Sequence, residues 1–221
     1  MNLFSAFASS VRANTGKIAI FWGDEKITYD QIGAAASGLA FRLVSEQGIK
    51  AGDRVAIWLK NCPEFVSVIY GILRAGAVVV PINNFLKPDE VIHILKDAGA
   101  KALISESRME EGIGKLKEAI PDLKTIQIEI LGGATSNEIV PVVREEQDLA
   151  VIIYTSGTTG RPKGAMLSHG NLMHNVESCR QVLKAVSFDR FVVLLPMFHS
   201  FMLTVGVLLP KQVLLRSRDC L

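Results

Sequence analysis

Short apolar runs alternate with amphipathic segments along most of the chain. Continuous apolar runs, which are typical of strands buried on both faces, occur at residues 55–59, 77–80, 102–104 and 149–153. Apolar residues at helical spacing predict helices between these runs, at residues 28–48, 63–76, 88–99 and 109–120. This alternation predicts an α/β fold with a mainly parallel sheet and helices on both of its faces.

Local signals mark where several of these elements begin and end. Residues 28–31 have the form of a capping box, and Pro63 and Pro88 stand at the first position of the next two helices. Residues 125–130 alternate between apolar and polar types, which predicts an edge strand or a half-exposed strand. Residues 131–148 form the one long irregular stretch, so we expect a surface loop there.

Two apolar segments resemble targeting or membrane-spanning sequences. Near the N-terminus, apolar residues at helical spacing predict a small docking helix, with an organellar transit peptide as the alternative: Leu3, Phe4, Phe7 and Val11. Residues 191–209 carry no formal charge and are long enough to span a bilayer. Pro196 and His199 interrupt them, however, so we expect a buried strand followed by a buried helix.

Composition and charge narrow the class of protein. The 221 residues are 49% hydrophobic, which is ample for a packed core. The net charge is only +2, with both signs scattered and no basic stripe, so no nucleic-acid partner is predicted. The three cysteines show no metal-like spacing and predict a reduced, cytoplasmic compartment. His169 and His174 are five residues apart without a cysteine or acid to complete a site, so no metal site is predicted.

Residues 154–164 read Y-T-S-G-T-T-G-R-P-K-G and follow the buried run 149–153. Ligands of α/β proteins bind in such loops, which leave the carboxyl ends of buried strands. The loop contains three glycines, four hydroxyl side chains and two cations: Gly157, Gly160, Gly164, Thr155, Ser156, Thr158, Thr159, Arg161 and Lys163. Glycines let backbone N–H groups approach a polyanion closely. The composition predicts a phosphate-binding loop, and a turn joining two strands is the alternative.

This loop is not a Walker A sequence. Counted from Gly157, the second fixed glycine would fall on Pro162 and the terminal hydroxyl residue on Gly164. Residues 165–167 also read as a short strand, whereas a Walker A loop leads into a helix. Binding would then depend on loop amides, hydroxyls and Lys163. We expect the loop to be mobile when empty and to become ordered when a nucleotide binds.

The segment T-S-G-T-T-G-R-P-K-G, followed by S-H-G-N-L at residues 168–172, resembles the phosphate-binding loop of the acyl-adenylate-forming (AMP-binding) enzymes. That family includes acyl-CoA synthetases, luciferases and the adenylation domains of peptide synthetases. The segments I-L-R-A-G-A-V-V-V-P-I-N at residues 72–83 and L-P-M-F-H-S at residues 195–200 are similar to family segments in the same order. The resemblance covers residues 14–210 and is greatest to fatty acyl-CoA synthetases. It implies the first part of their large N-terminal domain.

The resemblance also implies a reaction and its site residues. A carboxylate, here of a fatty acid, would attack the α-phosphate of ATP in the presence of Mg²⁺ to give an acyl-adenylate and pyrophosphate. A thiol of coenzyme A or of an acyl carrier would then displace AMP and form a thioester. The implied phosphate-binding residues are Thr155, Ser156, Gly157, Thr158, Thr159 and Gly160, with Lys163 neutralising the departing pyrophosphate. The main Mg²⁺ ligand is expected outside the chain.

His199 has two interpretations. The pair Phe198-His199 matches an aromatic-histidine pair that the family places near the carboxylate and that is associated with fatty or aryl acids. A neutral imidazole there could orient the carboxylate or gate its tunnel. From the residues alone, a single histidine in an apolar run is more typical of a core or helix-end position.

The resemblance divides the chain at residue 210. It places a partial adenylation domain at residues 1–210, whereas the basic run 211–218 departs from the family pattern. We therefore expect residues 211–221 to be an atypical tail related to truncation, and the fragment alone to be inactive. Two other functions stay open: a phosphate- or nucleotide-binding module without turnover, and a catalytically silent, membrane-associated remnant. Peripheral membrane contact is an open prediction as well.

Overall fold

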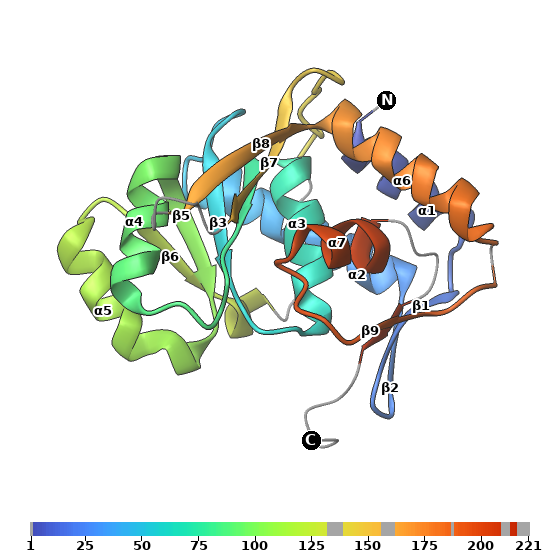
Figure 1. Cartoon of the computed structure of the whole chain (residues 1–221), viewed down its shortest axis with the longest axis horizontal. Helices are drawn as coiled ribbons and strands as arrows, with labels where there is room; N and C mark the ends of the chain where they lie inside the picture. The colour runs from blue at the N-terminus through green and yellow to red at the C-terminus, as the bar shows by residue number, and fades with distance from the viewer. Residues whose placement is uncertain (1, 132–138, 156–161, 187, 209–212, 216–221) are drawn as a thin grey trace.

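A six-stranded sheet forms the centre of the molecule (Figure 1). The computed structural model describes residues 2–131, 139–155, 162–186, 188–208 and 213–215. The strand order is β6-β5-β3-β4-β7-β8, and the strands are β3 (Arg54–Trp58), β4 (Val78–Pro81), β5 (Ala100–Ser105), β6 (Lys124–Gln127), β7 (Leu149–Thr155) and β8 (Lys163–Ser168). All neighbouring pairs are parallel except β7 and β8, which are antiparallel. The mainly parallel sheet is confirmed.

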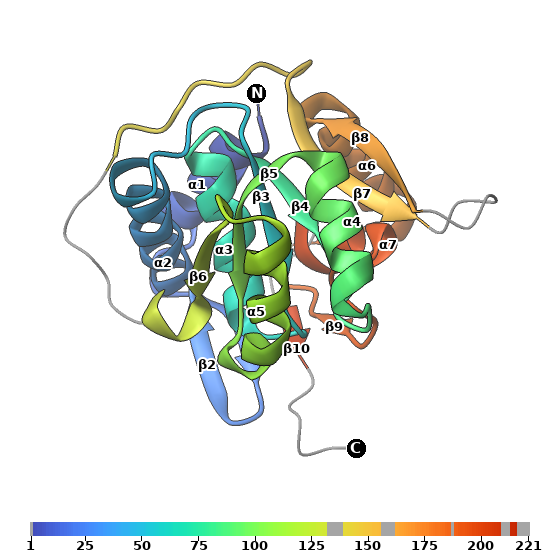
Figure 2. The ribbon, with the colours of Figure 1, turned by 90° about the vertical axis from the view of Figure 1, so that its left-hand side faces the viewer.

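Helices cover both faces of this sheet, as the alternation of segments predicts. The helices α1 (Leu3–Ala13), α2 (Tyr29–Phe41) and α3 (Pro63–Arg74) lie on one face, and α4 (Pro88–Ala98) and α5 (Glu110–Ala119) lie on the other (Figure 2). The apolar run at residues 55–58 of β3 contacts helices on both faces of the sheet. Val55 and Ile57 belong to the core cluster under α1–α3, whereas Ala56 and Trp58 belong to the cluster under α4 and α5.

The predicted helix signals act at the positions expected. Thr28 caps α2 and exchanges hydrogen bonds with Gln31, so the capping box is confirmed. Helix α2 continues into a π-helical segment, η1 (Arg42–Glu46), which keeps Leu43 buried. Pro63 and Pro88 are the first residues of α3 and α4. Local sequence therefore sets the helix starts around the sheet.

The edge strand is shorter than the sequence predicts. Strand β6 is at the edge of the sheet but ends at Gln127, and residues Ile128–Leu131 form a 3₁₀ turn, η3. The predicted continuation of the strand to Ile130 is therefore wrong. Glu129 explains the turn, because its Oε1 accepts hydrogen bonds from the backbone N–H and hydroxyl of Ser107. Ser107 belongs to η2 (Ser107–Met109), which leads into α5.

A second, four-stranded sheet is not predicted by the sequence pattern. Its order is β2-β1-β10-β9, and its strands are β1 (Ile18–Trp22), β2 (Glu25–Thr28), β9 (Phe191–Val193) and β10 (Val213–Leu215). Strands β1 and β2 form an antiparallel hairpin, and β10 is parallel to both β1 and β9. Residues Val213–Leu215 thus join the folded part of the molecule, while the division of the chain at residue 210 stays a prediction.

The apolar segment at residues 191–208 folds as a strand followed by a helix. After β9, the helical turn α7 (Ser200–Met202) continues into the π-helical segment η4 (Leu203–Leu208). Met202, Leu203 and Val207 are buried in the core. Within the described ranges, no helix has the length and apolar character that crossing a membrane requires. The interpretation as a strand and a buried helix is confirmed.

The N-terminal segment forms the docking helix that its apolar spacing predicts. Leu3, Phe4 and Phe7 of α1 are buried. The ring of Phe7 stacks on that of Tyr70 in α3 with a centroid separation of 3.8 Å. The guanidinium of Arg74 lies 5.4 Å from the centroid of the Phe4 ring. Helix α1 is therefore an integral part of the core.

Candidate functional site

The predicted phosphate-binding loop connects two antiparallel strands. Thr155 at the end of β7 pairs with Lys163 at the start of β8, and both side chains are exposed. Residues directly opposite each other in an antiparallel pair project from the same face. Residues 156–161 lie outside the described part of the chain, so the roles predicted for Ser156, Gly157, Thr158, Thr159 and Gly160 stay predictions. The fold does bring the first hydroxyl and the lysine together at the mouth of the loop.

The segment after the loop is a strand, as expected. Lys163–Ser168 forms β8, and the following helix, α6 (His169–Leu183), begins only after it. In a Walker A loop, a helix N-terminus would follow directly and face the phosphates. The structure confirms that the loop differs from the Walker A arrangement in this respect.

Tyr154 fixes the root of the loop. Its hydroxyl donates a hydrogen bond to Oδ2 of Asp97 in α4. Burial, together with this bond to Asp97, raises the pKa of Tyr154, so the hydroxyl remains a donor. A Cβ at Gly164 would lie 3.0 Å from Cζ of Tyr154 and 2.8 Å from Cγ2 of Ile152. Gly164 is therefore required by close packing against the opposite strand.

His169 fixes the far end of β8. Ser168 caps α6 in a capping box with Asn171, and His169 is the first residue of the helix. The His169 side chain is only 1% exposed, and its Nδ1 accepts a hydrogen bond from the backbone N–H of Leu3 at 3.3 Å. Burial, with a smaller contribution from Arg144, lowers its pKa to about 4. His169 therefore stays neutral and ties α1 to α6.

Metal-ligating residues are not gathered anywhere in the part of the chain that the structure describes. Among those residues, no group of three or more His, Cys, Asp or Glu side chains could hold a metal ion. His169 is occupied by the contact with Leu3, and His174 is exposed on α6. Any Mg²⁺ that accompanies a nucleotide would take phosphate oxygens among its ligands.

His199 lies at a helix end and is exposed. Its backbone N–H donates to the carbonyl of Pro196 at 3.1 Å, closing a turn, and its Nδ1 accepts from the N–H of Phe201 at 3.3 Å. We assign the proton of the neutral imidazole to Nε2 from this hydrogen bond. His199 is thus the N-cap of α7, and its Nε2–H group remains able to donate to a ligand, while its role near the carboxylate stays a prediction.

Both candidate segments lie at the same edge of the central sheet. Thr155 ends β7, and Asn61 follows β3, whose carboxyl end points the same way because the β3–β4 and β4–β7 pairs are parallel. The side chain of Asn61 bonds to the backbone of Leu195 and of Met197, so the segment that carries His199 docks at this edge. Strand β4 separates β3 from β7, which corresponds to roughly 10 Å at the usual strand spacing. This carboxyl edge is the expected ligand-binding side of such a sheet.

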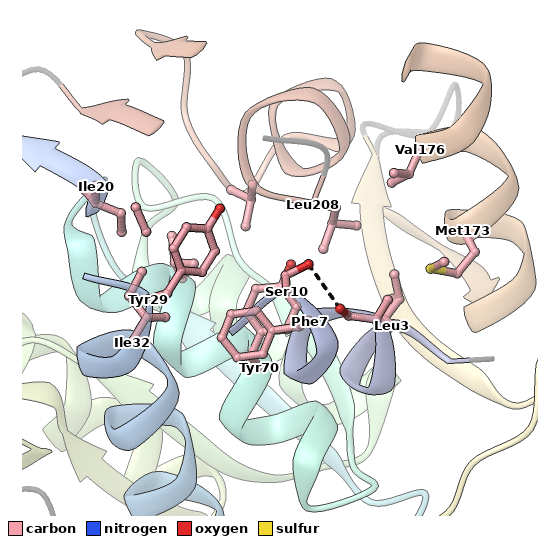
Figure 3. Close-up of a pocket in the computed structure, with 14 residues that line it drawn as sticks. Leu3, Phe7, Ser10, Ile20, Tyr29, Ile32, Tyr70, Met173, Val176 and Leu208 are labelled. Atoms are coloured by element: carbon pink, nitrogen blue, oxygen red, sulfur yellow. Dashed lines mark hydrogen bonds between the residues drawn. The ribbon is translucent and has the colours of Figure 1, made fainter. Parts of the chain in front are cut away.

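A cavity of about 200 Å³ lies elsewhere, between α1, β1, α2, α3, α6 and η4 (Figure 3). Leu3, Ile20, Ile32 and Val207 contribute hydrocarbon to its wall, and the polar lining groups are hydroxyls such as that of Ser10. The described residues that line it include no charged side chain. This cavity is therefore unsuited to a polyphosphate or a carboxylate and is separate from the candidate site.

The sequence did not predict that Asn61 and the Tyr154–Asp97 pair contribute to the site. Asn61 and the Tyr154–Asp97 pair hold the two site segments, but each acts through partners far away in the sequence. Tyr154 could have been suspected, because it is the only aromatic residue in the loop motif. Asn61 has no local signal beyond its place between a buried strand and a proline that begins a helix.

Comparison with known proteins defines the family. The chain matches the AMP-binding enzyme family over residues 7–213. One solved structure with the same fold is ATP-bound MatB from Rhodopseudomonas palustris, with a TM-score of 0.85 and 29% identity; the match covers 97% of this chain and 45% of that one. Another is the o-succinylbenzoate CoA synthetase MenE from Bacillus subtilis in complex with the acyl-adenylate OSB-AMP, with a TM-score of 0.84 and 26% identity. That match covers 98% of this chain and 56% of the MenE chain. The chain belongs to the AMP-binding enzyme family.

Curated relatives differ in the acid that their names specify. The oxalate–CoA ligase of Arabidopsis thaliana is 32% identical over 84% of this chain and 38% of its own length. The long-chain-fatty-acid–CoA ligase FadD13 of Mycobacterium tuberculosis is 33% identical over 83% of this chain and 38% of its own length. Tyrocidine synthase 3 of Brevibacillus parabrevis is 30% identical over 78% of this chain and 3% of its own length. The chain thus spans well under half the length of these relatives.

Proposed function

We propose that the polypeptide to which this chain belongs activates a fatty acid with ATP. The products of the first step would be an acyl-adenylate and pyrophosphate, and coenzyme A would then displace AMP to give a thioester. The single observation that carries this proposal is the exposed pair of Thr155 and Lys163, which faces the mouth of a glycine- and threonine-rich loop in a chain of the AMP-binding family. We propose a cytoplasmic location, and peripheral membrane contact stays a prediction.

The pair suits the charge that develops in the first step. When the carboxylate attacks the α-phosphate, negative charge builds up on the departing pyrophosphate. Hydroxyl and amide donors held in place before the reaction stabilise that charge without reorganisation. Thr155 supplies one hydroxyl and Lys163 a full positive charge from opposite strands. Mg²⁺ bound to the nucleotide would supply further neutralisation.

The imidazole of His199 is suited to donate a hydrogen bond to the carboxylate of the acid. Since Nδ1 accepts the hydrogen bond of Phe201, Nε2–H is left to donate to a carboxylate oxygen. A neutral donor would orient the carboxylate without neutralising the charge that makes it a nucleophile. The choice of a fatty acid is supported by the Phe198-His199 pair and by the similarity to FadD13, a long-chain-fatty-acid–CoA ligase.

The test uses the complete gene product and measures pyrophosphate release with ATP, Mg²⁺ and fatty acids of graded length. We expect Lys163→Ala to lower the rate about 100-fold, as the loss of one transition-state partner does. Lys115→Ala, on the exposed side of α5, is the matched control and should keep the rate. Equal rates for Lys163→Ala and the unmodified protein would contradict the proposal.

The 221-residue chain provides a second test. We expect it to form no thioester, because it spans only 38% of the length of a relative such as FadD13. Titration with pyrophosphate should still show binding that Lys163→Ala weakens. Pyrophosphate binding together with a complete product that never turns over would favour the phosphate-binding module without turnover.

A further inference from the structure

Asn61 joins two segments of the chain that are 134 residues apart. It lies between β3 and α3, one residue before Cys62, the N-cap of α3, and is partly buried. Its Nδ2 donates to the carbonyl of Leu195 at 2.9 Å, and its Oδ1 accepts from the backbone N–H of Met197 at 2.8 Å. One side-chain amide therefore holds the backbone on both sides of Pro196.

This arrangement needs an asparagine. Pro196 has no N–H, so the segment around it lacks one of the groups with which a neighbouring strand could pair. The asparagine amide offers a donor and an acceptor side by side, as a backbone peptide group does. Aspartate at this position would keep the acceptor for Met197 but lose the donor for Leu195, and alanine would lose both.

The two hydrogen bonds of Asn61 hold a segment that leads directly to His199. The carbonyl of Pro196 accepts the N–H of His199 at 3.1 Å, and the carbonyl of His199 accepts the N–H of Leu203 at 2.8 Å. Asn61 therefore fixes the first residue of the turn whose last residue is His199. The direction of the imidazole, and its bond to the N–H of Phe201, follow from that turn.

We propose that Asn61 is a positioning residue for His199 and, through it, for the carboxylate of the acid. This inference rests on the proposed function for the identity of the ligand and on the hydrogen bonds alone for the positioning. The segment has a second anchor, because the side chain of Met197 is fully buried. Loss of the amide should therefore alter the geometry of the turn while the segment stays docked.

The experiment compares Asn61→Ala, Asn61→Asp and the unmodified complete gene product. In Asn61→Ala, we expect the KM for the acid to rise about tenfold and the kcat to fall, with the KM for ATP within about twofold. A residue that only supports the fold would reduce the active fraction and leave both KM values unchanged. Asn14→Ala is the matched control, since the Asn14 amide bonds locally to the carbonyl of Ser10 in α1.

A second readout does not depend on activity. In Asn61→Ala, the amide of Met197 should exchange with solvent about tenfold faster, and the ¹⁵N signals of His199 should lose the pattern of a single Nε2–H tautomer. Asn61→Asp should keep the protection of Met197, because it keeps the acceptor. Unchanged exchange and unchanged tautomer in Asn61→Ala would overturn the proposal.

The two readouts separate this inference from the proposed function. If Lys163→Ala lowers turnover as expected but Asn61→Ala leaves the KM for the acid unchanged, positioning of the carboxylate is overturned while the ligase function stands. If the complete protein has no ligase activity, the proposed function fails, and exchange and tautomer alone decide whether Asn61 positions His199.

Discussion

The two ends of the β7–β8 hairpin are built in opposite ways. At the end away from the loop, His169 is buried. Its backbone N–H donates to the carbonyl of Asp148 at 3.0 Å, and its Nδ1 accepts a hydrogen bond from the N–H of Leu3. Arg144 and Asp148 form an ion pair of 3.3 Å beside it. At the loop end, Thr155 and Lys163 are exposed. One end is fixed by partners from distant segments, and the other presents polar groups to solvent.

This difference indicates that one end of the hairpin stabilises the fold and that the other end is suited to binding a ligand. A binding site needs polar groups that are free to exchange water for a ligand, and the strands that carry them need a rigid base. Tyr154 and Gly164 form the strand pair next to the loop end, where Tyr154 is anchored to Asp97 and Gly164 packs closely against Ile152. Substitutions at the base should therefore change stability more than ligand binding, and substitutions at the mouth should do the opposite.

The largest expected effect is a loss of stability in acid at the His169 end of the β7–β8 hairpin. The pKa of His169 is lowered from 6.5 to about 4 in the folded protein, so the unfolded state binds the proton more readily. The stabilising contribution of the neutral ring is complete above about pH 6.5 and is lost as the pH falls toward 4, by about 3 kcal/mol in total. Urea unfolding of the chain at pH 7 and pH 4 measures this loss.

The matched variants identify the group responsible. His169→Asn keeps an acceptor near Leu3 but does not titrate, so it should lose about 3 kcal/mol less between these pH values than the unmodified chain. His174→Asn, on an exposed position of the same helix, should behave like the unmodified chain. If the unfolding free energies of His169→Asn and of the unmodified chain depend on pH in the same way, a neutral His169 does not stabilise this end of the hairpin.

An intermediate effect is expected at Gly164. The added Cβ of Gly164→Ala would contact Ile152 and Tyr154 at 3.0 Å or less, so the hairpin must shift, at a cost of about 2 kcal/mol in the free energy of unfolding. Gly114→Ala is the control, because nothing lies within 4 Å of its Cβ position in α5, and it should stabilise the chain by up to about 1 kcal/mol. Equal stability of the two variants would mean that the hairpin does not need this close packing.

The smallest expected effect is at the Tyr154–Asp97 hydrogen bond. Tyr154→Phe removes the donor and keeps the ring, so it should cost about 1 kcal/mol of unfolding free energy. In a double-mutant cycle with Asp97→Ala, the second substitution should add little to the first, because both remove one interaction. Fully additive losses would show that the hydroxyl and the carboxylate act independently.

The sequence by itself determined the alternation of strands and helices along the chain, the capping residue Thr28 and the strand that follows the phosphate loop. These features depend on side chains a few residues apart, so periodicity and cap chemistry report them directly. The residue types of the loop and the segment around His199 likewise indicated the family, which the match over residues 7–213 confirms. The individual roles of the loop residues stay predictions.

Only the tertiary structure decided which distant groups hold the site. The bonds of Asn61 to Leu195 and Met197, the bond of Tyr154 to Asp97 and the contact of His169 with Leu3 join residues 57 to 166 positions apart. The second sheet likewise pairs β1 with β10 from the opposite end of the chain. A single asparagine, tyrosine or histidine leaves no periodic pattern, because its partner is chosen by how packed elements meet. The sequence therefore specified the main elements of the central sheet, and packing specified the contacts that place Thr155, Lys163 and His199 at one edge of the sheet.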